Sequence, residues 1–254
     1  MSEAPILITG AGNGIGFYTA CYLQELGYSV IGHFHQTIND KEKFQAVCLD
    51  TFQADLRQRE SVSKLCSEIS SKYPCLRGII HNASSFSPMA TDTLTACNQF
   101  ESFVAVHMFA PFQINLQLQA LLFNYVESQK CEAKNKSAQS HGLADIIHIT
   151  DIYTENPNPQ FANYCATKAG LENLSLSFAK ILSPSVKVNT IQPGPISFKP
   201  FHDKDKQDAV IDSTLLGRQG TPEAIAKAIV SLLDNNYMTG TRLQVDGGRH
   251  LTHN

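Results

Sequence analysis

Short apolar runs alternate with longer amphipathic stretches along most of the chain. The apolar runs predict strands at residues 5–9, 29–34, within 45–55, 76–81, 143–150, 186–191 and 241–245. The stretches between them predict helices, most clearly at residues 15–26, 99–126, 163–182 and 222–233. Strands this apolar are typical of a parallel sheet that helices cover on both faces. The pattern therefore predicts an α/β fold, with a doubly wound parallel sheet of seven strands.

Two segments interrupt the alternation. Residues 130–141 (KCEAKNKSAQSH) are polar and predict a surface loop between a helix and a strand, with a domain linker as the other interpretation. Residues 197–215 contain Pro200, several charges and few core residues, which predicts a flexible flap over the active site. Because the same alternation continues on both sides of these segments, we expect residues 1–254 to form a single domain.

Composition narrows the class of protein. A net charge of −3 over 254 residues gives no electrostatic basis for binding nucleic acid or an anionic membrane. Seven scattered cysteines without a CxxC pair predict reduced thiols and no metal site. The N-terminal residues lack the features of a signal peptide, and no stretch approaches the ~20 apolar residues of a membrane span. We expect a soluble, cytoplasmic protein.

The first predicted strand ends in a glycine-rich turn, TGAGNGIG at residues 9–16. Glycines let the backbone turn tightly and approach a pyrophosphate at the N-terminus of the next helix, where free amides favour negative charge. A plain strand–helix turn is the alternative. The position directly after a first strand favours nucleotide binding and a Rossmann-type domain.

The end of the second predicted strand bears on which dinucleotide binds. Residues 32–37 (GHFHQT) contain no carboxylate that would bind a ribose 2′-hydroxyl and repel a 2′-phosphate. The segment favours NADP(H), with His33, His35 or Gln36 as candidate donors to the phosphate. Alternatively, these histidines are surface residues at a strand end.

Tyr164 and Lys168 lie four residues apart at the start of a predicted helix, so they share one face. An ammonium beside a phenol favours the phenolate and lowers the tyrosine pKa from about 10. Tyr164 is thus a candidate general acid. A solvated helix face is the alternative for such a pair taken alone.

The chain resembles the short-chain dehydrogenase/reductase family over essentially the whole length of the chain, and it carries the family's motifs in order. They are TGxxxGIG at 9–16, Asp55-Leu56, HNAS at 81–84, Tyr164-xxx-Lys168, PGP at 193–195 and VDGG at 245–248. The resemblance implies catalytic Tyr164 and Lys168. It also implies a cofactor site formed by Gly10, Asn13, Gly14, Ile15, Gly16, His33, Phe34, His35, Asp55, Leu56, Asn82, Ala83, Ser84, Thr150, Tyr164, Lys168, Pro193, Gly194, Pro195 and Ile196.

One departure from the family pattern points to the substrate. The family's usual serine, 13 residues before the tyrosine, is Asp151 here. An ionised carboxylate would repel the negative charge that develops on the oxygen of a ketone. It suits a substrate rich in N–H donors and can relay a proton to a ring nitrogen. Asp151 therefore favours reduction of a C=N bond. Alternatively, Asp151 only caps the strand end, and Thr150 or Tyr153 does the work of the serine.

These departures resemble one branch of the family, the bacterial dihydromonapterin reductases and, more distantly, the pteridine reductases. Phe86 in NASSF resembles the aromatic residue that stacks on the pterin, although a loop phenylalanine packed in the core is the alternative. His107 stands where the family usually has an asparagine that supports a relay water, and it is either a relay group or a core histidine. Both relatives carry arginine at position 14, and the dihydromonapterin enzymes carry it at position 35.

The sequence thus predicts an NADPH-dependent reductase of 7,8-dihydromonapterin or a similar dihydropterin, with dihydrofolate as a further substrate. Its substrate site is predicted to comprise Ser84, Phe86, Asp151 and Tyr164. Two other functions remain open: a reductase of a carbonyl such as a 3-oxoacyl thioester, and a non-catalytic NADP-binding redox sensor. The resemblance also implies a homotetramer.

Overall fold

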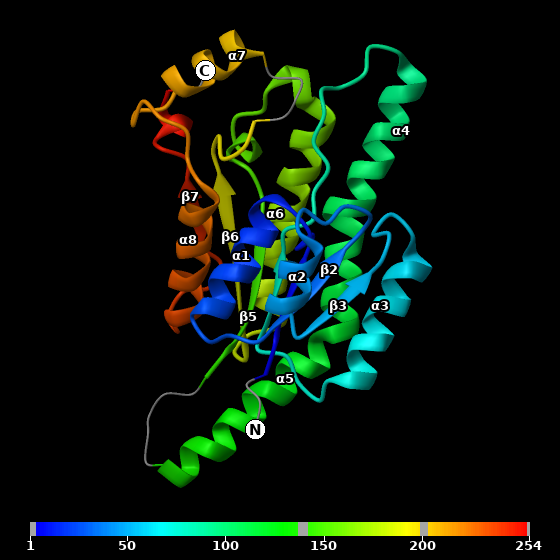
Figure 1. Ribbon diagram of the computed structural model, residues 1–254, viewed down its shortest axis with the longest axis vertical. Coiled ribbons are helices and arrows are strands. Elements are labelled where there is room, and N and C mark those ends of the chain that lie inside the picture. The colour runs from blue at the N-terminus through cyan, green and yellow to red at the C-terminus, as the bar shows by residue number, and fades with distance from the viewer. Residues whose placement is uncertain (1–3, 137–141, 199–202, 253–254) are drawn as a thin grey trace.

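One parallel sheet of seven strands forms the centre of the computed structural model, which describes residues 4–136, 142–198 and 203–252 (Figure 1). The strands are β1 (Ile6–Thr9), β2 (Val30–Phe34), β3 (Asp50–Gln53), β4 (Gly78–His81), β5 (Ala144–Ile149), β6 (Val186–Pro193) and β7 (Arg242–Val245). Their order is β3-β2-β1-β4-β5-β6-β7, with every neighbouring pair parallel. The predicted seven-stranded parallel sheet is confirmed.

Helices cover both faces of the sheet, and each layer encloses its own apolar core. One face is covered by α1 (Gly14–Glu25), α2 (Lys41–Val47) and α8 (Pro222–Asp234). The other is covered by α3 (Arg59–Lys72), α5 (Ala110–Lys136) and α6 (Ala162–Ile181), with α4 (Thr93–Val104) packed beside α6. Within the described part of the chain, no helix is long and apolar enough to cross a membrane.

The strand order reverses between β1 and β4, which lie side by side although 68 residues of chain separate the end of one from the start of the other. In open parallel sheets, ligands bind at the carboxyl ends of the strands at such a switch point. The turn after β1 and the HNAS segment after β4 both lie there. The topology therefore brings these two motifs together at the carboxyl ends of β1 and β4.

One sequence-based expectation about a loop is corrected by a helix, and the segment predicted as a flap contains a helix that the sequence pattern did not predict. The helix predicted at 99–126 belongs to a longer run from Thr93 to Lys136, so residues 130–136 are helical rather than loop, and 137–141 lie outside the described residues. The segment predicted as an irregular flap contains a helix, α7 (Lys204–Asp212), which begins where the Asp203 side chain accepts a bond from the Lys206 amide. No residue of α7 is buried, and six of its nine residues are polar or charged. Residues 199–202 of that segment also lie outside the description.

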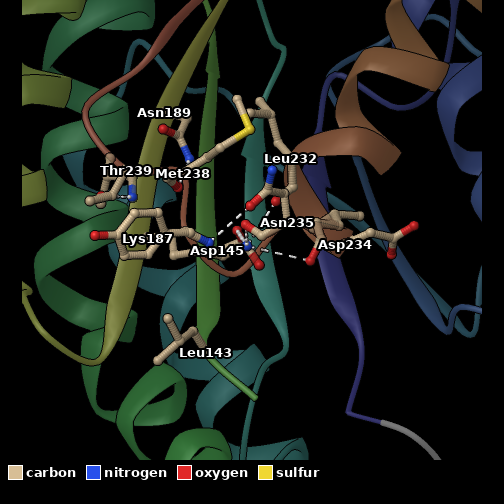
Figure 2. A network of polar contacts seen from close by, with 12 residues as sticks. Leu143, Asp145, Lys187, Asn189, Leu232, Asp234, Asn235, Met238 and Thr239 are labelled. Atoms are coloured by element: carbon tan, nitrogen blue, oxygen red, sulfur yellow. Dashed lines mark hydrogen bonds and ion pairs between the residues drawn. The ribbon is translucent and has the colours of Figure 1, made fainter. Parts of the chain in front are cut away.

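A buried charge network lies at the opposite end of the sheet, near the amino ends of β5 and β6. Figure 2 shows Lys187 of β6 pointing to the C-terminal turn of α8 and to Asp145 of β5. The Lys187 ammonium lies 3.1 Å from the Asp145 carboxylate, and it donates to the carbonyls of Leu232 (2.7 Å) and Asn235 (2.9 Å). Arg77 pairs with the other Asp145 oxygen. A lysine suits a helix C-terminus because the last carbonyls have no intrahelical partner and carry partial negative charge.

We expect Lys187→Met to lower the free energy of unfolding by about 3–5 kcal/mol, the range for breaking a buried ion pair by removing one partner. The side chains of Lys187 and Asp145 are only 2% and 1% exposed, so water cannot replace the lost contact. Urea unfolding measures the effect. Lys227→Met is the matched control, because its ion pair with Glu223 lies on the surface of α8 and is worth about 0.5 kcal/mol or less. Equal losses in the two variants would contradict this account of the network.

Candidate active site

A cavity of about 890 Å³ opens at the carboxyl edge of the sheet. It extends from the end of β2, past the glycine-rich turn, to Tyr164 and Lys168 on α6. Every predicted cofactor residue except Gly16 lines it. A volume in this range is that of a small-molecule or cofactor site.

The glycine-rich turn fits the backbone closely against the segment after β4. Gly10 has a φ of +68°, and a Cβ there would lie 2.8 Å from the Ala83 Cα. A Cβ on Gly16 would lie 2.3 Å from the Gly10 carbonyl oxygen, so Gly16 serves packing inside the turn. Asn13 makes no side-chain bond at the start of α1, and the first turn of that helix has no acidic residue. The turn thus presents a helix N-terminus suited to a pyrophosphate.

His33 supports this turn from β2. Its Nδ1 accepts a bond from the Gly10 amide at 3.2 Å, and its Nε2 donates to the Ala54 carbonyl at 3.1 Å. Burial lowers the pKa of His33 to about 4, so the ring is neutral near pH 7. The expectation that His33 donates to a phosphate is therefore corrected, because both ring nitrogens are already used.

A cluster of charged side chains lies at the same end of the cavity. Arg57 holds Asp55 through its Nε (2.9 Å) and Nη2 (2.7 Å) atoms. His35 Nε2 lies 3.7 Å from the same carboxylate. The hydrogen bond from Arg57 lowers the pKa of Asp55 to about 2, so this carboxyl is ionised and paired. The parallel register of β2 and β3, with Phe34 opposite Gln53, brings these residues together.

At the other end of the cavity, Tyr164 contacts the residue that replaces the family serine. Its hydroxyl donates to Asp151 Oδ2 at 2.8 Å. The other oxygen, Oδ1, accepts the Tyr153 amide at 2.9 Å and caps the short helix at 152–154. Asp151 therefore caps the strand end and also contacts Tyr164. The Thr150 hydroxyl donates to the Ile191 carbonyl at 3.2 Å, so it does not take over the serine's contact.

Lys168 lies beneath Tyr164 and is 2% exposed. Its ammonium donates to the Ile149 carbonyl at 2.8 Å and lies 5.7 Å from the centre of the Tyr164 ring. Burial lowers the pKa of Lys168 to about 8. A lysine held this way can bind a ligand hydroxyl at the cavity floor.

The acid–base properties of Tyr164 differ from the sequence-based expectation. Burial, followed by the negative charge of Asp151, raises the pKa of Tyr164 well above 10, whereas the pairing with Lys168 predicted a lowered value. Burial also raises the pKa of Asp151 from its ordinary value. Tyr164 is therefore a protonated donor in this state, and its proton is directed at a carboxylate.

His107 is buried beside the cavity without lining it. It lies in a π-helical turn (Ala105–Phe109) between α4 and α5, and such turns recur at functional sites. Its Nε2 accepts the Ser85 amide at 3.2 Å, and its Nδ1 lies 2.8 Å from the Thr167 hydroxyl. Nε2 also lies 3.0 Å from the Ser84 hydroxyl. His107 thus ties the loop after β4 to α6, next to Tyr164.

Phe86 lines the cavity from that loop. Its ring stacks on Phe161 with centroids 4.5 Å apart, and it meets the Tyr164 ring edge-on at 4.8 Å. Phe86 is half-buried, and it packs against the small apolar cluster around Tyr164. It therefore has both features that the sequence left as alternatives: a place on the cavity wall and packing against core residues.

The cavity is also lined by residues that were not among the predicted site residues, including Arg57, Phe161 and Arg249. Arg57 follows the Asp55-Leu56 motif directly, and a search for cations near that motif would have found it. Arg249 follows the VDGG motif, but nothing in its spacing shows that the chain returns to the active site. Phe161 directly precedes α6, and no local sequence pattern marks it as a cavity residue.

The chain is similar to known proteins over nearly its whole length. A family model described as enoyl-(acyl carrier protein) reductase matches residues 10–250. Dihydromonapterin reductase of Klebsiella pneumoniae is 32% identical over 252 residues, which cover 97% of each chain. The Escherichia coli protein of the same name, from strain 536, is 31% identical over 256 residues and 97% of each chain.

A solved structure shows the same fold. FolM alternative dihydrofolate reductase 1 from Brucella canis, complexed with NADP, superposes with a TM-score of 0.83. The superposition covers 100% of this chain and 96% of the other, at 23% sequence identity.

Proposed function

The chain belongs to the short-chain dehydrogenase/reductase family, and from this premise we propose that it is an NADPH-dependent reductase of dihydropterins. Its proposed reaction takes 7,8-dihydromonapterin, or a similar dihydropterin, to the tetrahydro form, with dihydrofolate as a further substrate. The observation that carries this proposal is the contact between Tyr164 and Asp151 at 2.8 Å, in the place of a serine. The names of the relatives support the same substrate class.

The residues present fit a dinucleotide. The open helix N-terminus after Asn13 would hold the pyrophosphate, and Lys168 would hold the ribose next to the nicotinamide. The segment Pro193–Ile196 lines the cavity beside Asp151 and would hold the carboxamide. When bound, the cofactor supplies the hydride.

This chain's own groups would control the protons. Reduction of a C=N bond adds a hydride to carbon C6 and a proton to nitrogen N5 of the dihydropterin. Tyr164 is protonated before the reaction because its pKa is raised, and it donates a hydrogen bond to Asp151. Protonated Asp151, a form that burial favours by raising its pKa, would pass a proton to the ring nitrogen. The carboxylate left behind would regain a proton from water through the Tyr164 hydroxyl. In its ionised form, Asp151 disfavours an alkoxide in the same position.

Arg57 and His35 support NADPH over NADH. Both lie at the end of β2 where a 2′-phosphate would sit, and β2 ends without a carboxylate of its own. Arg57 Nη1 is not used in the pair with Asp55, so it can donate to a phosphate.

We expect Arg57→Ala to raise the KM for NADPH by about tenfold, the size of one lost charge-assisted bond, and to leave the KM for NADH unchanged. Steady-state kinetics with each cofactor measure the split. Arg59→Ala is the matched control, because that side chain lies over the Phe109 ring. If both cofactors lose affinity equally in the Arg57 variant, the phosphate is held elsewhere.

We also propose a homotetrameric enzyme of the cytoplasm. A row of exposed apolar side chains, Phe109, Phe112, Leu116 and Phe123, follows one face of the helix run around α5. Spacings of three, four and seven residues keep such a row on one side of a helix, where a second copy can cover it. All seven cysteines are free thiols, as a reducing compartment requires.

A substrate panel tests the proposed function. Oxidation of NADPH is followed with dihydromonapterin, dihydrobiopterin, dihydrofolate, a simple ketone and a 3-oxoacyl thioester. We expect turnover with the dihydropterins and little with the carbonyl compounds. The 3-oxoacyl thioester tests the carbonyl reductase that the sequence left open as an alternative. Turnover of the ketone or thioester alone would overturn the proposal, and no turnover with intact NADPH binding would favour a redox sensor.

A further inference from the structure

Arg249 is a buried cation that the chain directs into the active-site cavity. Gly247 and Gly248 have φ values of +66° and +79°, which turn the chain back after β7. The Asp246 carboxylate fixes this turn by accepting the amides of Gly248 (3.0 Å) and His250 (2.7 Å). Arg249 lines the same cavity as Asp151 and Tyr164, although it is only 6% exposed.

The partners of this guanidinium in the described part of the chain are neutral. Its Nε donates to the Ser213 hydroxyl at 2.7 Å, and its Nη1 donates to the Tyr153 hydroxyl at 3.1 Å. Its carbon Cζ lies 5.5 Å from the centre of the Tyr153 ring. The nearby Asp246 is paired with His250 instead. A buried charge without a direct ion pair is unfavourable, so a site that keeps one is expected to use it on a ligand.

Asp151 lies in the same cavity and carries the opposite charge when it is ionised. Burial has the largest influence on the pKa of Asp151 and raises it. The hydrogen bonds from Tyr153 and Tyr164, the charge of Lys168 and, last, the charge of Arg249 lower it. A carboxylate accepts from N–H groups, and a guanidinium donates to oxygen. The two charges together are therefore complementary to a heterocycle that carries N–H donors and a carbonyl oxygen. The glycine at position 14 contributes no side chain to this cavity, and nothing lies within 4 Å of the position that a Cβ would take there.

We propose that Arg249 is a substrate-binding residue, whose guanidinium donates to the ring carbonyl oxygen of the dihydropterin and orients the ring against Asp151. The proposal rests on the proposed function and specifies its binding site. The same cation could instead meet a carboxylate on the tail of a folate. The two candidate acceptor groups occur in different substrates. The ring carbonyl is present in every dihydropterin, whereas the tail carboxylate is present only in dihydrofolate.

The test compares Arg249→Met, Arg249→Lys and the matched control Ser213→Ala, which removes a contact of Arg249 and keeps its charge. KM and kcat are measured with dihydromonapterin and with dihydrofolate, at saturating NADPH. We expect Arg249→Met to raise both KM values by about tenfold or more, the effect of one lost hydrogen bond from a charged group. Arg249→Lys should cause a smaller rise, and Ser213→Ala should stay within about threefold, because it leaves the guanidinium in place. The Kd for NADPH should not change in any variant.

Three results would overturn the inference: an unchanged KM in Arg249→Met, a rise confined to dihydrofolate, or an equal rise in Ser213→Ala. The last would mean that Arg249 only anchors the end of α7. If Arg249→Met does not fold, Arg249→Lys decides by the same criteria.

Equilibrium binding of dihydromonapterin to the enzyme with NADP⁺ separates this inference from the proposed function. If the wild-type protein binds dihydromonapterin but does not reduce it, the proposed function is wrong, and the Kd values of the variants for dihydromonapterin then test the role of Arg249. If the wild-type protein does not bind dihydromonapterin, both the proposed function and the role of Arg249 are wrong.

Discussion

Replacing Tyr164 with phenylalanine is expected to lower kcat for dihydropterin reduction by a factor of about 10²–10⁴, the range for loss of a general acid. The hydroxyl lies 2.8 Å from Asp151 and is the proton donor that the cavity directs at that carboxylate. The ring remains, so its packing against Phe86 and the position of Lys168 should persist. The Kd for NADPH should therefore change little.

Stopped-flow kinetics and a fluorescence titration with NADPH measure the two quantities separately. Tyr28→Phe is the control, because its hydroxyl contacts Asp234 at the surface of the protein. A Tyr164→Phe enzyme with near wild-type turnover would show that another group supplies the proton.

Asp151→Asn is the second change with a large expected effect. Asparagine is as good a helix cap as aspartate, so the bond from the Tyr153 amide should survive. The amide cannot pass on a proton, and we expect kcat/KM for dihydropterin to fall about 10²-fold.

The pH dependence of the two enzymes should differ as well. Burial raises the pKa of Asp151, so its protonated, proton-donating form persists to higher pH than in an ordinary aspartate. Reduction consumes a proton, and kcat of the wild-type enzyme should fall as pH rises through this pKa. The Asp151→Asn profile should lack that step. Identical profiles for the two enzymes would exclude Asp151 from the proton path.

The sequence could predict the sheet and the order of its motifs because both depend on local patterns. Strongly apolar runs mark β1, β4, β5 and β6, and the motifs follow directly at their carboxyl ends. The helices α2, α3 and α7 were not predicted. The helix α7 buries no residue, whereas α3 has a regular apolar stripe (Val62, Leu65, Cys66 and Ile69) that could have predicted it. The end of α5 was also missed, because its last residues are polar.

The properties of the site depended on contacts between distant segments. Arg57 reaches the end of β2 only through the pairing of β2 with β3. The pKa of Tyr164 is raised because burial and the charge of Asp151 outweigh the effect of the lysine four residues away. The spacing of residues in the sequence does not show how deeply a side chain is buried. Arg249 reaches the cavity because two glycines in the left-handed conformation, Gly247 and Gly248, turn the chain back toward the active site.

The central claim is that a carboxylate in place of the serine directs this enzyme to a C=N bond. The most direct measurement is the ratio of kcat/KM for dihydromonapterin to that for a simple ketone, in the wild-type enzyme and in Asp151→Ser. Serine can also cap the helix at 152–154, so the comparison isolates the carboxylate. We predict a ratio far above one in the wild-type enzyme and a fall of about 100-fold in Asp151→Ser, which corresponds to about 2.7 kcal/mol of differential transition-state stabilisation. An unchanged ratio, or a wild-type enzyme that prefers the ketone, would contradict the claim.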